Sequence, residues 1–129
     1  MTSTAVLKFK TSLVHKITEL YKNIYLFSRQ ISKKDRYGIY QRIEDNCLSI
    51  AESLLTACFE EKENKLAVLY PARVKIEVLK RLIRIANELN IINTGKYLGF
   101  QLKLEEISKM TNGWIKYVEE KLADKEIPN

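Results

Sequence analysis

The sequence contains few of the residues that break helices, with four glycines and two prolines among 129 residues. Folds that contain many turns, above all all-β folds, need more of both, so this composition argues against them. The chain also lacks any run of about 18 apolar residues, which argues against a membrane-spanning helix. Its start, MTSTA, lacks the basic and then apolar layout of a secretory signal. We therefore expect a cytoplasmic protein with no membrane partner.

Catalytic and metal-binding patterns are missing as well. His15 is the only histidine, so no catalytic triad with a histidine base is evident, and the sequence has no CxxC, HExxH or glycine-rich phosphate-binding motif. Cys47 and Cys58 lie on one expected helix, about 16 Å apart, which is beyond the reach of a disulfide. The carboxylate pair Glu44-Asp45 has no nucleophile or cofactor motif beside it, so we expect it to form a salt bridge or an interface. The sequence predicts no enzyme, no cofactor and no metal site.

Apolar residues recur in four stretches at alternating steps of three and four, which places one apolar stripe on each of four helices. The four stripes are Leu13, Ile17, Leu20, Ile24, Phe27 and Ile31; Tyr40, Ile43, Cys47, Ile50, Leu54 and Ala57; Val78, Leu82, Ile85, Leu89 and Ile92; and Tyr97, Phe100, Leu104, Ile107, Thr111, Trp114 and Val118. The helices are expected at about residues 7–30, 33–61, 71–90 and 94–122. Short connections make neighbouring helices antiparallel, so the sequence predicts an all-α, up-down four-helix bundle in a single domain, 1–129.

Local signals set the expected helix ends. Ser32 and Asp35 have the spacing of a capping box, so the second helix should start at residue 33, with close packing at Gly38 in its first turns. Pro71 is expected in the first turn of the third helix, because proline has no backbone N–H to donate. Residues 65–70 then form either a separate short turn or part of a kinked, continuous helix. Asn93 or Thr94 is the expected N-cap of the fourth helix, which should fray beyond Leu122.

The net charge of +6 is unevenly distributed, with basic excesses in residues 1–43 and 64–103 and an acidic excess in 44–63. Eight basic residues lie near the start of the second helix or opposite the expected stripe of the third. They are Lys33, Lys34, Arg36, Arg42, Arg73, Lys80, Arg81 and Arg84. Such groups can bind phosphates without reading sequence, and a helix N-terminus favours an anion. A merely solvated face, with Glu77 paired to Arg81, is the alternative.

Three stretches resemble a known family of small four-helix bundles. They are Ser32-Lys33-Lys34-Asp35-Arg36-Tyr37-Gly38-Ile39-Tyr40-Gln41-Arg42-Ile43-Glu44-Asp45; Leu82-Ile83-Arg84-Ile85-Ala86-Asn87-Glu88-Leu89; and Leu104-Glu105-Glu106-Ile107-Ser108-Lys109-Met110 with Gly113-Trp114. The family contains the accessory variability determinant (Avd) of diversity-generating retroelements. More distantly, the chain is similar to proteins encoded in intervening sequences of bacterial 23S ribosomal RNA.

The resemblance implies a homopentamer with a basic, barrel-shaped surface and no catalytic activity of its own. It also implies association with a reverse transcriptase and with template RNA or cDNA, and the eight basic residues above are the expected contacts. A bundle of the intervening-sequence type that docks only protein, and an enzyme with a site in the bundle core, remain alternatives.

Overall fold

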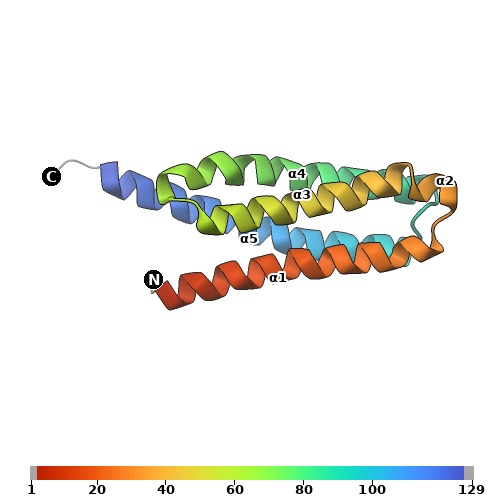
Figure 1. The fold of residues 1–129 in the computed structure, drawn as a ribbon, viewed down its shortest axis with the longest axis horizontal. Coiled ribbons are helices and arrows are strands. Elements are labelled where there is room, and N and C mark those ends of the chain that lie inside the picture. The colour runs from red at the N-terminus through yellow and green to blue at the C-terminus, as the bar shows by residue number, and fades with distance from the viewer. Residues whose placement is uncertain (1–2, 127–129) are drawn as a thin grey trace.

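The computed structural model describes residues 3–126, and every regular element in this range is helical. The four long helices are α1 (Ser3–Phe27), α3 (Ile39–Phe59), α4 (Lys62–Glu88) and α5 (Thr94–Glu126). A 3-10 helix η1 (Ser28–Gln30) and a short α2 (Lys33–Arg36) join the first two. The long helices lie side by side, with α1 against α3 and α5, and α4 against the same two (Figure 1). The predicted all-helical architecture with four long helices is confirmed.

The second predicted helix begins where expected but is interrupted. The Ser32 hydroxyl accepts a hydrogen bond from the Asp35 amide at 3.4 Å and donates one to the Asp35 carboxylate at 3.1 Å. The helix α2 then ends, with Tyr37 as its C-cap, and a new helix, α3, begins at Ile39 with Gly38 as its N-cap. A Cβ on Gly38 would lie 3.2 Å from the Lys34 carbonyl oxygen, so the predicted close packing at this glycine is against the preceding turn.

The predicted start of the third helix at Pro71 is wrong, because α4 begins at Lys62 and runs through the proline. The missing N–H of Pro71 leaves the carbonyl of residue 67 without its helical donor. Ala67 and Pro71 are both exposed, so water can bond this carbonyl, and the helix tolerates the proline. The alternative of a continuous helix is the better one. Residues 65–70 therefore belong to the bundle.

The turn from α4 to α5 is set by two asparagines. Asn90 has a left-handed backbone with φ of 60°, and the amides of Asn90 and Ile91 bond the carbonyls of Asn87 and Ala86, which is a Schellman motif. The Asn93 side chain then accepts from the Lys96 amide at 2.8 Å, so Asn93 is the N-cap of α5. This helix continues to Glu126, beyond the expected fraying point at Leu122, and Pro128 lies outside the described residues.

Three of the four predicted stripes form the core, with only Tyr97 partly exposed, but the third is offset. The buried apolar residues of α4 are Leu69, Ala72, Ile76, Leu79, Ile83 and Ala86. In the predicted stripe, Val78 and Leu89 are 45% and 61% exposed, Leu82 and Ile85 are partly buried, and only Ile92, after the helix, is buried. Two stripes with similar spacing run along α4, and the one with two alanines faces inward. The bulkier stripe faces out.

Candidate nucleic-acid interface

The first basic cluster lies at the end of the bundle that α2 covers (Figure 1). Lys33 and Lys34 are exposed on α2, and Arg42 is exposed on the first turn of α3. Because α2 has four residues, few peptide dipoles add along it, and the expected help from a helix N-terminus is small. Anion binding here would depend on the side-chain charges themselves.

Arg36 belongs to the same cluster in sequence but is engaged within the chain. Its side chain is half-buried and donates from Nη2 to the Ile31 carbonyl at 3.1 Å. Its Nε is buried and has no hydrogen-bond partner among the described residues. The guanidinium thus holds the connection between α1 and α2 and is less open to phosphate than its neighbours.

Lys80 is neutralised by its own bundle. Its ammonium lies 2.8 Å from the Glu105 carboxylate on α5 and 3.1 Å from that of Glu77, with 17% of the side chain exposed. Burial alone would lower the pKa of Lys80, but the two carboxylates outweigh burial and raise it. Glu77 therefore pairs with Lys80 rather than with Arg81, and Lys80 ties α4 to α5.

The three arginines of α4 are all exposed, but they differ in the contacts that their side chains make. Arg73 stacks on the ring of Tyr70, with 5.1 Å from its Cζ to the ring centre. Arg84 lies 3.7 Å from the Glu88 carboxylate, and a surface pair of this kind contributes little. Arg81 takes part in none of the ion pairs of the described residues. It remains a charge available to a partner.

The fold brings part of the predicted set together. Figure 1 shows α2 and the C-terminal end of α4 at the same end of the bundle, so Lys33, Lys34, Arg42 and Arg84 share that end. Arg73 lies eleven residues before Arg84 on α4, about 16 Å further along the helix. The eight residues therefore form an end cluster and a separate strip on α4, rather than one surface.

The prediction from sequence did not include a second pair of lysines, which lies at the end of the bundle away from α2. Lys65 is 9% exposed and donates to the Ala57 carbonyl in the last turn of α3 at 2.6 Å. The ammonium groups of Lys65 and Lys10 lie 5.9 and 5.7 Å from the ring centre of Trp114. Burial, and then the charge of Lys10, lower the pKa of Lys65. Its position four residues before Leu69, in step with the buried stripe, is the signal that could have found it.

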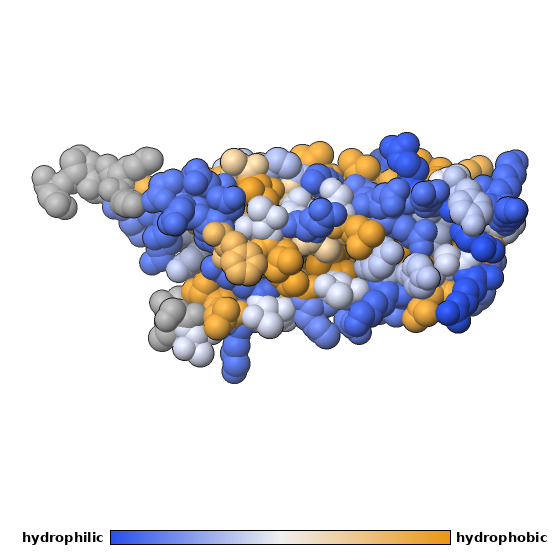
Figure 2. Space-filling view, in the orientation of Figure 1, coloured by the Kyte–Doolittle hydropathy of each residue, from blue (hydrophilic) through white to orange (hydrophobic). Residues whose placement is uncertain are grey.

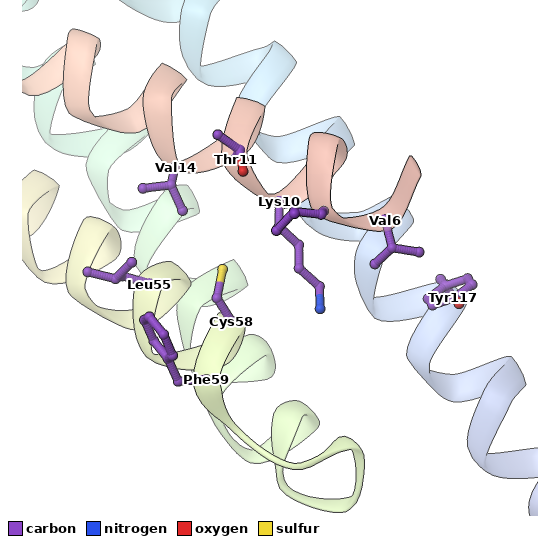
Figure 3. Close-up of a pocket in the computed structure, with 9 residues that line it drawn as sticks. Val6, Lys10, Thr11, Val14, Leu55, Cys58, Phe59 and Tyr117 are labelled. Atoms are coloured by element: carbon purple, nitrogen blue, oxygen red, sulfur yellow. The ribbon is translucent and has the colours of Figure 1, made fainter. Parts of the chain in front are cut away.

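A hollow of about 820 Å³ opens near these lysines, between α1, α3 and α5. Its walls are mostly apolar, with Val14, Leu55 and Phe59 among them, and Lys10 and Cys58 lie within it (Figure 3). Burial raises the pKa of the Cys58 thiol, which keeps it protonated and a poor nucleophile. The hollow therefore has the chemistry of a packing surface.

Two further structural features bear on function. The part of the chain that the structure describes holds no group of three histidine, cysteine or acidic side chains placed to bind a metal ion. In the same part, none of the helices has the length and apolar character needed to cross a membrane.

Comparison with known proteins identifies a family for the chain. The model of the bAvd-like family matches residues 12–118, a range that includes most of α1 and α5 and all of α2, α3 and α4. No curated protein and no solved structure matches the chain. The match covers well over half of the sequence, so the chain belongs to the bAvd-like family and is, at the level of that family, an Avd-type accessory protein.

Proposed function

We propose that the chain is a non-catalytic accessory protein of a diversity-generating retroelement. It binds the reverse transcriptase and nucleic acid, either template RNA or cDNA, and so supports mutagenic reverse transcription. It works in the cytoplasm as a homopentamer. The family match over residues 12–118 is the observation that carries this proposal.

The distribution of charge supports the nucleic-acid part of the proposal. One end of the bundle exposes four basic residues, Lys33, Lys34, Arg42 and Arg84, and none of them forms a buried ion pair among the described residues. Five copies of a chain with net charge +6 carry about +30, which attracts a polyanion and steers its approach. Binding of this kind releases counterions, so it is sensitive to salt and indifferent to base sequence.

Fluorescence anisotropy with a labelled single-stranded RNA tests the end cluster. We expect Lys33→Glu with Lys34→Glu to weaken binding by about tenfold or more near physiological salt, because two phosphate contacts become repulsive. The control is Lys109→Glu with Lys116→Glu, two exposed residues of α5 whose replacement changes the net charge equally. Equal effects of the two pairs, or no binding by the unmodified chain, would contradict the proposed contact.

Affinity purification tests the protein partner. The tagged chain should retain the reverse transcriptase of its own retroelement after nuclease treatment, if the contact is between proteins.

The second candidate function is a bundle of the intervening-sequence type that docks only protein. The internal engagement of Arg36 and Lys80 favours it, since it removes two of the eight predicted contacts. Absence of any RNA binding would select this candidate.

A further inference from the structure

The hollow between α1, α3 and α5 has the size and composition of a small-molecule site. Its volume is about 820 Å³. Sites of this size form between the helices of bundles, and their walls are mainly apolar with a few polar groups. Figure 2 shows apolar side chains gathered between α1 and the C-terminal half of α3, where the hollow opens. Leu7 and Phe59 line it and are 64% and 84% exposed, so the bundle itself leaves this apolar surface uncovered.

Two positive charges lie at the inner end of the hollow. Lys10 is partly buried, and Figure 3 shows its side chain directed inward between α1, α3 and α5. Lys65 is 9% exposed, and the ammonium groups of both lysines lie within 6 Å of the ring centre of Trp114, which is 3% exposed. Both lysines also lower the pKa of the Cys58 thiol, against the larger effect of burial. The two ammonium groups therefore share one largely buried place.

The two ammonium groups have no counter-ion. Neither takes part in an ion pair among the residues that the structure describes. Lys65 donates one of its three N–H groups to the Ala57 carbonyl, and the Trp114 ring attracts cations but carries no net charge. Burial, and then the charge of Lys10, lower the pKa of Lys65, and Glu60 opposes this to a smaller extent. An anion between the two lysines would relieve their repulsion.

We infer that the hollow binds a single-chain amphiphile with a carboxylate head, such as a medium-chain fatty acid. The carboxylate lies between the ammonium groups of Lys10 and Lys65 and accepts hydrogen bonds from both. Charge-assisted bonds of this kind are strong where little water reaches them. The alkyl chain runs along the apolar walls that include Val14, Leu55 and Phe59. This site goes beyond the proposed function, because it does not involve nucleic acid.

The distribution of charge and exposure selects this class of ligand. A neutral apolar molecule would leave the two ammonium groups unpaired, and a small polar anion would leave Leu55 and Phe59 uncovered. An amphiphile satisfies both. The walls extend from Val6 to Val14, about 12 Å along α1, and an extended alkyl chain of about ten carbons spans a similar length.

The orientation of the site favours a free fatty acid over a lipid in a bilayer. Lys65 and Trp114 are buried, whereas Leu7 and Phe59 are exposed, so the head occupies the inner end and the tail leads outward. A lipid in a bilayer presents its head to a protein and keeps its tail in the membrane. It could not place its head between the lysines with its tail against these walls.

Trp114 provides a direct measurement of binding. It is the only tryptophan in the sequence. It also lines a smaller hollow of about 150 Å³ that shares Val6 and Tyr117 with the larger one. Its fluorescence therefore responds to a ligand that reaches the two ammonium groups.

A fluorescence titration with decanoate, below the concentration at which it forms micelles, tests the inference. We expect a saturable change in Trp114 emission. Decanol has the same chain without the charge, and it should bind about tenfold more weakly because it loses the hydrogen bonds to charged groups. Octanoate should also bind roughly tenfold more weakly than decanoate, because it buries two fewer CH₂ groups. Isothermal titration calorimetry repeats each comparison without relying on the ring.

Two variants with matched controls locate the site. Lys10→Met should weaken decanoate binding about tenfold and leave decanol binding unchanged, because it removes one ammonium and keeps an apolar side chain. Its control is Lys8→Met, an exposed residue of α1 that does not line this hollow. Leu55→Glu should abolish decanoate binding by placing a carboxylate in the wall. Its control is Leu48→Glu, seven residues earlier on α3 and outside the hollow. Circular dichroism should show unchanged helicity for all four variants.

Several results would overturn the inference. Equal affinities for decanoate and decanol would show an apolar contact that the lysines do not direct. Equal effects of Lys10→Met and Lys8→Met would show attraction by net charge alone. The absence of decanoate binding in both fluorescence and calorimetry would leave the hollow to a protein, either a partner or a second copy of the chain. The RNA-binding test of Lys33 and Lys34 is independent of all these outcomes.

Discussion

Ile83→Ala tests most sharply which face of α4 enters the core. Ile83 is fully buried, whereas its neighbour Leu82 is only partly buried on the outer stripe. Truncation of Ile83 removes three carbon atoms, worth about 2.4 kcal/mol of transfer free energy. The cavity left behind adds to this, so we expect a loss of about 3–4 kcal/mol in the free energy of unfolding. Leu82→Ala should cost about 1 kcal/mol, because water already reaches part of that side chain.

Urea unfolding followed by circular dichroism measures both variants. The protein concentrations must be equal and the mass of each variant recorded, because dissociation of an assembly would itself lower the midpoint. With unchanged slopes, the difference appears in the two midpoints. Equal losses, or a larger loss for Leu82→Ala, would refute the assignment of the inward face.

Three other changes test local features of the fold. Pro71→Ala should raise the free energy of unfolding by about 1 kcal/mol, because it restores a helical N–H. A lower urea midpoint for this variant would show that the proline side chain itself stabilises the fold. Asn90→Ala should lower the free energy of unfolding by about 1 kcal/mol, because alanine is strained at this left-handed position, and Asn90→Gly should lower it less. Equal melting temperatures for the two variants would contradict the φ of 60° at Asn90. Lys65 has a lowered pKa, so the folded chain holds this proton less tightly than the unfolded chain, and stability should rise as the pH approaches about 10.4. Lys65→Met should reduce this rise, and identical pH profiles for the two proteins would rule out the buried ammonium.

The sequence predicts the helices well where only one apolar stripe is present. α1 and α3 each bury the stripe that their spacing indicates, and Ser32 and Asn93 act as caps as expected. On α4, two stripes compete, and spacing alone cannot decide between them. Packing decides it, because Ala72 and Ala86 permit close approach of α4 to its neighbours. Pro71 misled the prediction of the helix start because the solvation of a neighbouring carbonyl depends on the finished fold.

The candidate site is only partly predictable for a related reason. The local sequence identifies which residues carry charge, but not which of these charged side chains form contacts within the folded chain. Lys80 pairs with Glu105 across two helices, and the Arg36 guanidinium turns back to the Ile31 carbonyl. Both contacts depend on how elements meet in space. Lys33, Lys34 and Arg42 lack such partners in the described part of the chain, so their predicted exposure is confirmed while their binding role stays a prediction.

The salt dependence of RNA binding tests the central claim most directly. Each phosphate contact contributes about 0.7 to the slope of log affinity against log salt for a single strand. We predict a steep negative slope for the unmodified chain, and a slope shallower by about 1.4 per engaged subunit for Lys33→Glu with Lys34→Glu. An affinity that does not change with salt, or a slope that the double substitution leaves unaltered, would contradict a nucleic-acid accessory role for this end of the bundle.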